Sequence, residues 1–239
     1  MKKINKKILV SIFIFFIILL LSVSIIIANN ALNKTNFEID KEKIYYEIKY
    51  FDARIVYMIN LLNNIHGDNN FYINWGELQT QTQSIYTYWN SAILDLNYLD
   101  TDKSSLTNFS KNLDKLTIAI KNNDKESTLN TLVELYSKLN IYSEIIDDNY
   151  NNLLDIKYNL LCAYSVAEKE NWTLTHEYIL KSSESVSNLV NSMENNEFSQ
   201  YNINQAYIAV KELENLIDIK DLDIFYFKYK IAIEKLNNL

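Results

Sequence analysis

The sequence predicts an all-α protein in which an N-terminal transmembrane helix precedes two tandem helical units. The 239 residues include no proline and only two glycines, Gly67 and Gly76. Proline and glycine are common in tight turns and at the ends of strands, whereas helices avoid them. One long apolar run follows the N-terminal lysines, and apolar residues then recur at intervals of three and four along the chain. Because 48% of the residues are hydrophobic, the chain can also bury a large core.

The apolar run extends from Ile8 to Ala28 and contains 21 residues without a charge. A helix of this length spans about 31 Å, which matches the hydrocarbon core of a bilayer. Four lysines precede the run: Lys2, Lys3, Lys6 and Lys7. By the positive-inside rule they place the N-terminus in the cytoplasm. The sequence therefore predicts a single-pass protein of the cell membrane, with an anchor over residues 1–30, a polar linker over 31–43 and the bulk of the chain extracytoplasmic.

A cleaved signal peptide is the alternative to this anchor. Signal peptides have a shorter apolar region, of about 7 to 15 residues, which ends in a small-x-small site. Here the candidate sites are Ser22-x-Ser24, inside the run, and the sequence ANNA after it, so an uncleaved signal-anchor is favoured. The single cysteine, Cys162, lies far from any lipoprotein position, which excludes a lipid-modified N-terminus.

Charge and cysteine content exclude further classes. Removing the four leading lysines leaves 19 basic and 30 acidic residues, a net charge near −11 for the remainder. This sign excludes a nucleic-acid-binding surface, which requires a basic footprint. One cysteine cannot form an intrachain disulfide. Cys162 is interpreted as a small buried hydrophobe, with an intermolecular disulfide as the alternative.

The first predicted helix carries a stripe with heptad spacing: Ile44, Ile48, Phe51, Ile55, Met58, Leu62 and Ile65. The stripe either packs inside the first unit or forms a dimer seam. His66 to Asn70 then end the helix, with Gly67 at the cap. Asn74 is the expected N-cap of the next helix, Trp75 its first residue, and Glu77 the residue that completes a capping box.

Three later helices follow the same spacing in the first unit, and each has a counterpart 97 positions later. The second helix carries Trp75, Leu78, Thr82, Ile85, Trp89, Ala92, Leu96 and Leu99, and its counterpart carries Trp172, Thr175, Ile179, Ser182, Val186, Leu189 and Met193. The third pair carries Leu106, Phe109, Leu113, Leu116 and Ile120 against Ile203, Ala206, Val210, Leu213 and Ile217. Asp124 and Asp221 are the expected caps of the fourth pair, which includes Leu132 and Leu139 against Tyr229 and Leu236.

These correspondences predict an internal duplication with an offset of 97, giving one unit over residues 44–146 and a second over 147–239. The opening helix of the second unit would carry Leu153, Ile156, Leu160, Ala163 and Ala167, after a shorter connection. No glycine or proline separates the fourth helix from the fifth, so one continuous helix through both is a second possibility. About four helices in each unit form either a bundle or a short α-solenoid. The competing interpretation is that the two units are unrelated and share only the apolar spacing that all helical bundles have.

Trp75, Trp89 and Trp172 have two interpretations. Trp75 and Trp172 each follow an Asn cap, where a ring can lie across a neighbouring helix and fix its angle. Core packing is the favoured role for all three rings, and contact with a partner is the alternative.

No pattern in the sequence indicates chemistry. His66 and His176 are the only histidines, and together with one cysteine they do not form a zinc-type ligand set. No glycine-rich loop is present to hold a phosphate group. Three acidic pairs remain, and they are interpreted as solvated surface: Asp147-Asp148, Glu168/Glu170 and Glu194/Glu197. The expectation is therefore a protein that is not an enzyme and has no cofactor and no metal.

Trp75, Trp89, Ile120 and Asp124 on helical spacing, behind a leading apolar segment, resemble a group of single-pass helical proteins of Gram-positive, spore-forming bacteria. That group is classed as a domain of unknown function. The resemblance covers about residues 1–142 and implies location and fold, without an activity. The second half departs from it, since Val186 replaces the second tryptophan.

The leading functional hypothesis is a non-enzymatic, membrane-tethered module that presents a groove or face to a protein or peptide of the cell envelope, since tandem helical units form such surfaces. An extracytoplasmic ligand-sensing bundle that acts through a partner is the alternative. An extracytoplasmic hydrolase is a third hypothesis, and it requires carboxylates that converge in a pocket.

Overall fold

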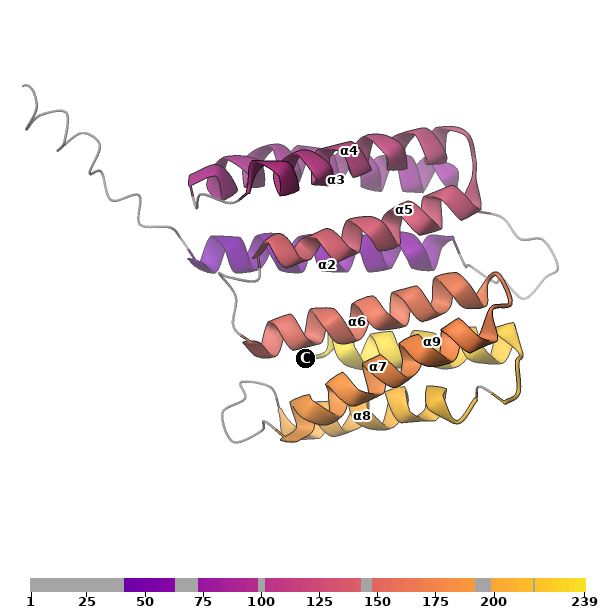
Figure 1. Ribbon diagram of the computed structural model, residues 1–239. Coiled ribbons are helices and arrows are strands. Elements are labelled where there is room, and N and C mark those ends of the chain that lie inside the picture. The colour runs from indigo at the N-terminus through magenta and orange to yellow at the C-terminus, as the bar shows by residue number, and fades with distance from the viewer. Residues whose placement is uncertain (1–40, 63–72, 99–101, 143–147, 192–198, 217) are drawn as a thin grey trace, which may run out of the picture. The chain divides into compact units, whose positions relative to one another are not determined.

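A computed structural model describes residues 41–62, 73–98, 102–142, 148–191, 199–216 and 218–239 (Figure 1). Within these residues the chain forms eight α-helices and one 3-10 helix and no strand, which confirms the all-α class. The elements are α2 (Lys41–Leu61), α3 (Trp75–Tyr98), α4 (Lys103–Lys121), α5 (Lys125–Ser137), η1 (Lys138–Tyr142), α6 (Asp148–Ala167), α7 (Trp172–Asn191), α8 (Gln200–Glu214) and α9 (Leu222–Asn237).

The predicted transmembrane helix requires a correction. Among the helices from Lys41 to Leu239 that the structure describes, none is both long enough and apolar enough to cross a membrane. Each of them is amphipathic, and even the most buried, α6, carries Asp148, Asp155 and Lys157. The anchor residues Lys2, Lys3, Lys6, Lys7, Ile8 and Ala28 lie outside the described residues. The single-pass cell-membrane location, the signal-anchor and the membrane contact through an N-terminal helix are therefore not supported.

The first four helices form a closed four-helix bundle. Helix α2 packs on α3, α3 on α4 and α4 on α5, and the contact between α2 and α5 closes the ring. The stripe predicted on the first helix lies in this core, where Ile44, Ile48, Phe51, Ile55, Met58 and Leu62 are all buried. Packing inside the bundle therefore accounts for these residues, while Ile65 and the predicted cap His66–Asn70 lie outside the described residues.

The last four helices repeat this arrangement. Helix α6 packs on α7, α7 on α8 and α8 on α9, and α6 also contacts α9. The two bundles meet where α5 packs on α6, which lie side by side in Figure 1. Helix α5 does not continue into α6, because it ends at Ser137 and passes into the 3-10 helix η1.

Polar side chains cap the helices as the sequence predicts. The side chain of Asn74 accepts from the backbone N–H of Glu77 at 3.0 Å, and that of Asn171 accepts from Leu174 at 3.2 Å. Asp124 and Asp221 accept from the backbone N–H three residues later, at 3.0 and 2.9 Å. The reciprocal half of the predicted capping box is absent at Glu77, whose carboxylate instead accepts from Gln81 at 2.5 Å. Each cap satisfies a donor that the first turn leaves without an intrahelical partner.

Positions 97 residues apart are buried alike. Both members are buried in the pairs Leu78/Thr175, Thr82/Ile179, Ile85/Ser182, Trp89/Val186, Ala92/Leu189, Leu106/Ile203, Phe109/Ala206, Leu113/Val210, Leu116/Leu213, Leu132/Tyr229 and Leu139/Leu236. Large and small side chains exchange places between corresponding positions of the two bundles. Trp89 and Phe109 correspond to the smaller Val186 and Ala206, whereas Thr128 and Leu132 correspond to the larger Phe225 and Tyr229. Such exchanges keep the total volume of a core nearly constant. The similarity is a property of the fold, and the duplication itself stays a prediction.

Candidate functional site

A buried ion pair lies at the junction of the two bundles. The Lys157 ammonium on α6 lies 2.7 Å from the Asp52 carboxylate on α2, and the two side chains are 3% and 7% exposed. The other Asp52 oxygen accepts from the hydroxyl of Tyr136 on α5 at 2.9 Å. Burial and the nearby Asp52 carboxylate together raise the pKa of Tyr136, so this phenol remains a donor. Three helices from both bundles are thus joined by one polar cluster.

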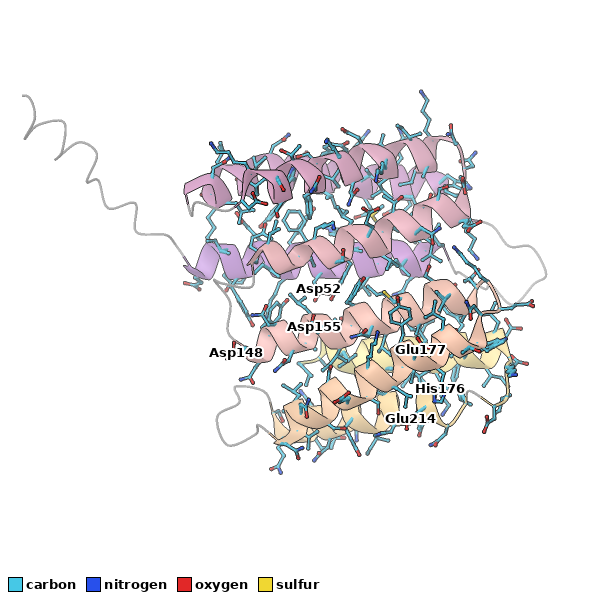
Figure 2. The ribbon with its side chains drawn as sticks, viewed as in Figure 1. Asp52, Asp148, Asp155, His176, Glu177 and Glu214 are labelled. Carbon is cyan, nitrogen blue, oxygen red and sulfur yellow. The ribbon has the colours of Figure 1, made fainter. Side chains whose placement is uncertain are left out.

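An open groove of about 390 Å³ lies over this ion pair, and we call it the junction groove. One face of α2, one face of α6 and the C-terminal end of α9 form its walls. They include Lys49 and Tyr57 on α2, Tyr150 and Lys157 on α6, and Leu236 on α9. The rings of Tyr45 and Tyr150, with centroids 5.1 Å apart, meet near one end of these faces. Figure 2 shows Asp52 on the side of α2 that is turned toward α6.

The three tryptophans, which are the candidate partner-binding residues, occupy different environments. Trp89 is 2% exposed, stacks on Phe109 with centroids 4.0 Å apart, and donates its indole N–H to Ser110 at 2.8 Å. It is therefore a core residue. Trp75 and Trp172 are half-buried at the first positions of α3 and α7, where part of each ring is accessible.

Trp75 lines a second pocket, of about 330 Å³ between α3 and α4, which we call the α3–α4 pocket. Tyr86 lies on the same wall about three helical turns later and donates its hydroxyl to Asp114 at 2.5 Å. Ile120 is the apolar residue on the α4 side. The remaining lining is polar and includes Gln79, Gln83, Thr117, Lys121 and Asn123. The two aromatic rings can contact an apolar group of a ligand, while the amides form hydrogen bonds with the polar groups beside it.

The tryptophan at the corresponding position of the second bundle has different neighbours. Trp172 packs edge to face against Phe225, with ring centroids 6.2 Å apart. The residue 97 positions before Phe225 is Thr128, which is much smaller and fully buried. Ser183, the counterpart of Tyr86, donates to Glu214 at 2.8 Å, and Lys211 pairs with the same carboxylate at 2.9 Å. The two half-buried tryptophans therefore have the same helical position and different neighbours.

Comparisons of the chain with protein-family models, curated proteins and solved structures each found no match.

The resemblance to single-pass helical proteins of spore-forming bacteria therefore stays a prediction. The same is true of the absence of an enzymatic activity. The assignment of function depends on the two sites described above.

The carboxylates examined for catalysis lie on several helices. Figure 2 shows Asp52, Asp148, Asp155, Glu177 and Glu214 distributed over α2, α6, α7 and α8. Within the described ranges, no group of three or more His, Cys, Asp or Glu side chains is arranged to hold a metal ion. Of the acidic pairs singled out in the sequence, Asp147, Glu194 and Glu197 lie outside the described residues, and Glu168 pairs with Lys125 at 2.9 Å.

His176 and Cys162 show no arrangement for nucleophilic chemistry. His176 is half-buried on α7 and lies near the Glu214 carboxylate, whose pKa is lowered chiefly by hydrogen bonds from Lys211 and Ser183. Ser183 donates to Glu214 rather than to a histidine. Cys162 is buried and its pKa is raised by burial, as expected for a structural thiol. His66 lies outside the described residues.

A second buried carboxyl lies in the first bundle. Glu47 on α2 is 2% exposed, and its Oε2 has no hydrogen-bond partner among the described residues. Burial, and after it the neighbouring Asp95 on α3, raise the pKa of Glu47 against the opposing effect of Lys43, so that it reaches about 7. Lys43 itself pairs with Asp95 at 2.5 Å. At neutral pH the Glu47 carboxyl is therefore partly protonated.

Proposed function

We propose that this protein is an interaction module that binds a segment of a partner protein or peptide in the α3–α4 pocket. The observation that carries the proposal is the half-buried Trp75 ring, which forms an accessible wall of a 330 Å³ pocket together with Tyr86. Trp and Tyr are the residues most enriched among those that dominate binding energy at protein interfaces.

The lining of the pocket fits an apolar side chain flanked by peptide groups. Trp75, Tyr86 and Ile120 provide apolar contact, which stabilises a buried aromatic or aliphatic side chain. The amides of Gln79, Gln83 and Asn123 can donate to and accept from the backbone of the same segment. A partner that presents one aromatic or large aliphatic side chain in an exposed segment satisfies both parts of the pocket.

Replacing Trp75 with alanine is expected to weaken binding of such a segment at least tenfold, because it removes one apolar wall of the pocket. The experiment selects peptides from a phage-displayed random 12-residue library on the full-length chain and measures their affinities by isothermal titration calorimetry. Trp172→Ala is the matched control, because it removes the ring at the corresponding helical position without touching the pocket. Its affinity for the selected peptides is expected to stay within twofold.

The proposal is abandoned if no peptide is enriched, or if selected peptides bind the Trp75→Ala and Trp172→Ala variants equally well. Circular dichroism of both variants checks that the helices are intact.

A second candidate function is the sensing of a small ligand in the same pocket, and the pocket volume favours it. About 330 Å³ lies at the lower end of the range for small-molecule sites, roughly 300–1,000 Å³. A thermal-shift screen of a metabolite library discriminates the two functions. Stabilisation by a metabolite that is lost in Trp75→Ala, without any enriched peptide, supports sensing.

A further inference from the structure

A further cavity, of about 470 Å³, lies where the end of α5 meets α6, and we call it the α5–α6 pocket. Residues 136–139, at the end of α5 and the start of η1, form one wall. Asn151, Leu154, Asp155 and Tyr158 form the other wall, and their spacing places them on one face of α6. The pocket shares no described lining residue with the α3–α4 pocket or the junction groove.

The floor of this pocket is apolar and its rim is polar. Tyr136, Leu139 and Leu154 are buried, so they form the floor. The other lining side chains are half-buried or exposed and form the rim: Ser137, Lys138, Asn151, Asp155 and Tyr158. Sites for small molecules commonly combine apolar walls with a few polar groups that fix the orientation of the ligand.

Two opposite charges lie on the rim without pairing. Neither the Lys138 ammonium nor the Asp155 carboxylate forms an ion pair with a residue that the structure describes, although both line this pocket. Burial raises the pKa of Asp155, and no neighbouring cation in the described ranges offsets this effect. The pocket therefore holds a partly desolvated carboxylate and an ammonium that solvent or a ligand must satisfy.

These charges select the kind of ligand. Lys138 and Asp155 balance one another in sign, so the described lining favours neither a simple anion nor a simple cation. A ligand that carries an ammonium and a carboxylate complements both groups. An apolar side chain on the same ligand can contact the floor, which stabilises it by burial.

The size of the pocket favours a small molecule. Asn151 and Tyr158 are seven residues apart on α6, which corresponds to about 10 Å along the helix axis. A dipeptide extends over about 7 Å and fits within this length. The volume of about 470 Å³ also lies in the usual range for small-molecule sites, roughly 300–1,000 Å³.

We propose that the α5–α6 pocket binds a small zwitterion, an amino acid or dipeptide with an apolar side chain, whose ammonium pairs with Asp155 and whose carboxylate pairs with Lys138. The apolar side chain contacts Leu139 and Leu154 on the floor. This site goes beyond the proposed function and does not depend on it, because the two pockets have no described lining residue in common.

The test titrates the isotopically labelled full-length chain with leucine and with leucyl-leucine and follows backbone amide shifts by NMR. The controls are the N-acetylated forms, which lack the ammonium, and the C-amidated forms, which lack the carboxylate. The expected result is a set of shifts centred on residues 136–139 and 151–158. Each blocked form is expected to bind at least tenfold more weakly than the unblocked compound.

Two variants assign the charges individually. Asp155→Asn is expected to weaken binding of the unblocked compound at least fivefold and to remove its advantage over the N-acetylated form. Lys138→Gln is expected to remove the advantage over the C-amidated form instead. Lys121→Gln, which removes a lysine from the α3–α4 pocket, is the control and is expected to leave the affinity within twofold. Circular dichroism checks that the helices of each variant are intact.

Three results would overturn the proposal. They are absence of binding by both unblocked compounds, equal binding of blocked and unblocked forms, and charge variants that weaken every form alike. Binding that Trp75→Ala abolishes and Asp155→Asn leaves intact would also overturn it, because the zwitterion would then occupy the α3–α4 pocket. Failure of the peptide selection on the α3–α4 pocket would leave this result unchanged, so the two proposals fail separately.

Discussion

Replacing Lys157 with methionine is expected to lower the free energy of unfolding by about 3–5 kcal/mol. The substitution keeps most of the side-chain volume and removes the charge that compensates the buried Asp52 carboxylate. Among the side chains that the structure describes, the hydroxyl of Tyr136 would then be the remaining partner of Asp52. Chemical unfolding of the full-length chain in guanidinium chloride measures the change.

Two controls separate charge from packing. Lys125→Met breaks the more exposed pair with Glu168, whose side chains are 34% and 22% exposed, and is expected to cost less than about 1 kcal/mol. The triple substitution Asp52→Leu, Lys157→Met and Tyr136→Phe removes every polar member of the cluster, and it is expected to recover most of the lost stability. A Lys157→Met chain as stable as the unsubstituted one would contradict this account of the junction.

Stability is also expected to depend on pH through Glu47. The pKa of Glu47 is about 7 in the folded chain, whereas its ordinary value, which applies to the unfolded chain, is 4.5. The folded state therefore binds this proton more tightly than the unfolded state does. The stabilisation is complete below about pH 4.5 and is lost as pH rises through 7. A difference of this size corresponds to about 3 kcal/mol between the two ends of the range.

Glu47→Gln removes this dependence, because the amide stays neutral at every pH. The measurement is the free energy of unfolding at pH 5 and pH 8.5, compared between the unsubstituted chain and the variant. Glu42→Gln serves as the control, since Glu42 is an exposed glutamate on the same helix. The prediction is wrong if the difference between pH 5 and pH 8.5 is as large in Glu47→Gln as in Glu42→Gln.

Local patterns predicted most of the helical structure. The spacing of apolar residues on α2, and the caps Asn74, Asp124 and Asp221, depend on interactions within a few residues and are visible in the sequence. The end of α5 at Ser137 is not visible, because the chain changes to a 3-10 helix without a glycine or proline. The membrane anchor was predicted from the hydropathy of one segment and the lysines before it, and it gained no support from any described helix.

The candidate sites depend on contacts between residues far apart in the chain. Asp52 and Lys157 are 105 residues apart, and neither belongs to a motif. Lys157 lies four residues after Leu153 and three before Leu160, so it could have been noticed as a charge on a buried helix face. Trp75 was identified as a candidate, but its pocket depends on packing between α3 and α4. Trp172 differs from Trp75 in its neighbours because it packs against Phe225. This difference can be recognised only when the structures of both bundles are known.

The order of helix contacts also bears on how the chain reaches its native state. Within each bundle, successive helices pack on one another, so most loops that must close are short, and such low contact order is associated with rapid folding. The sequence contains no proline, which removes the isomerisation that slows refolding of many proteins to tens of seconds. Helices α5 and α6 contact one another at the boundary between the two bundles. Each bundle can form its own core before this contact is made. Assembly of the junction, with the desolvation of Asp52 and Lys157, is then the natural candidate for the slowest step.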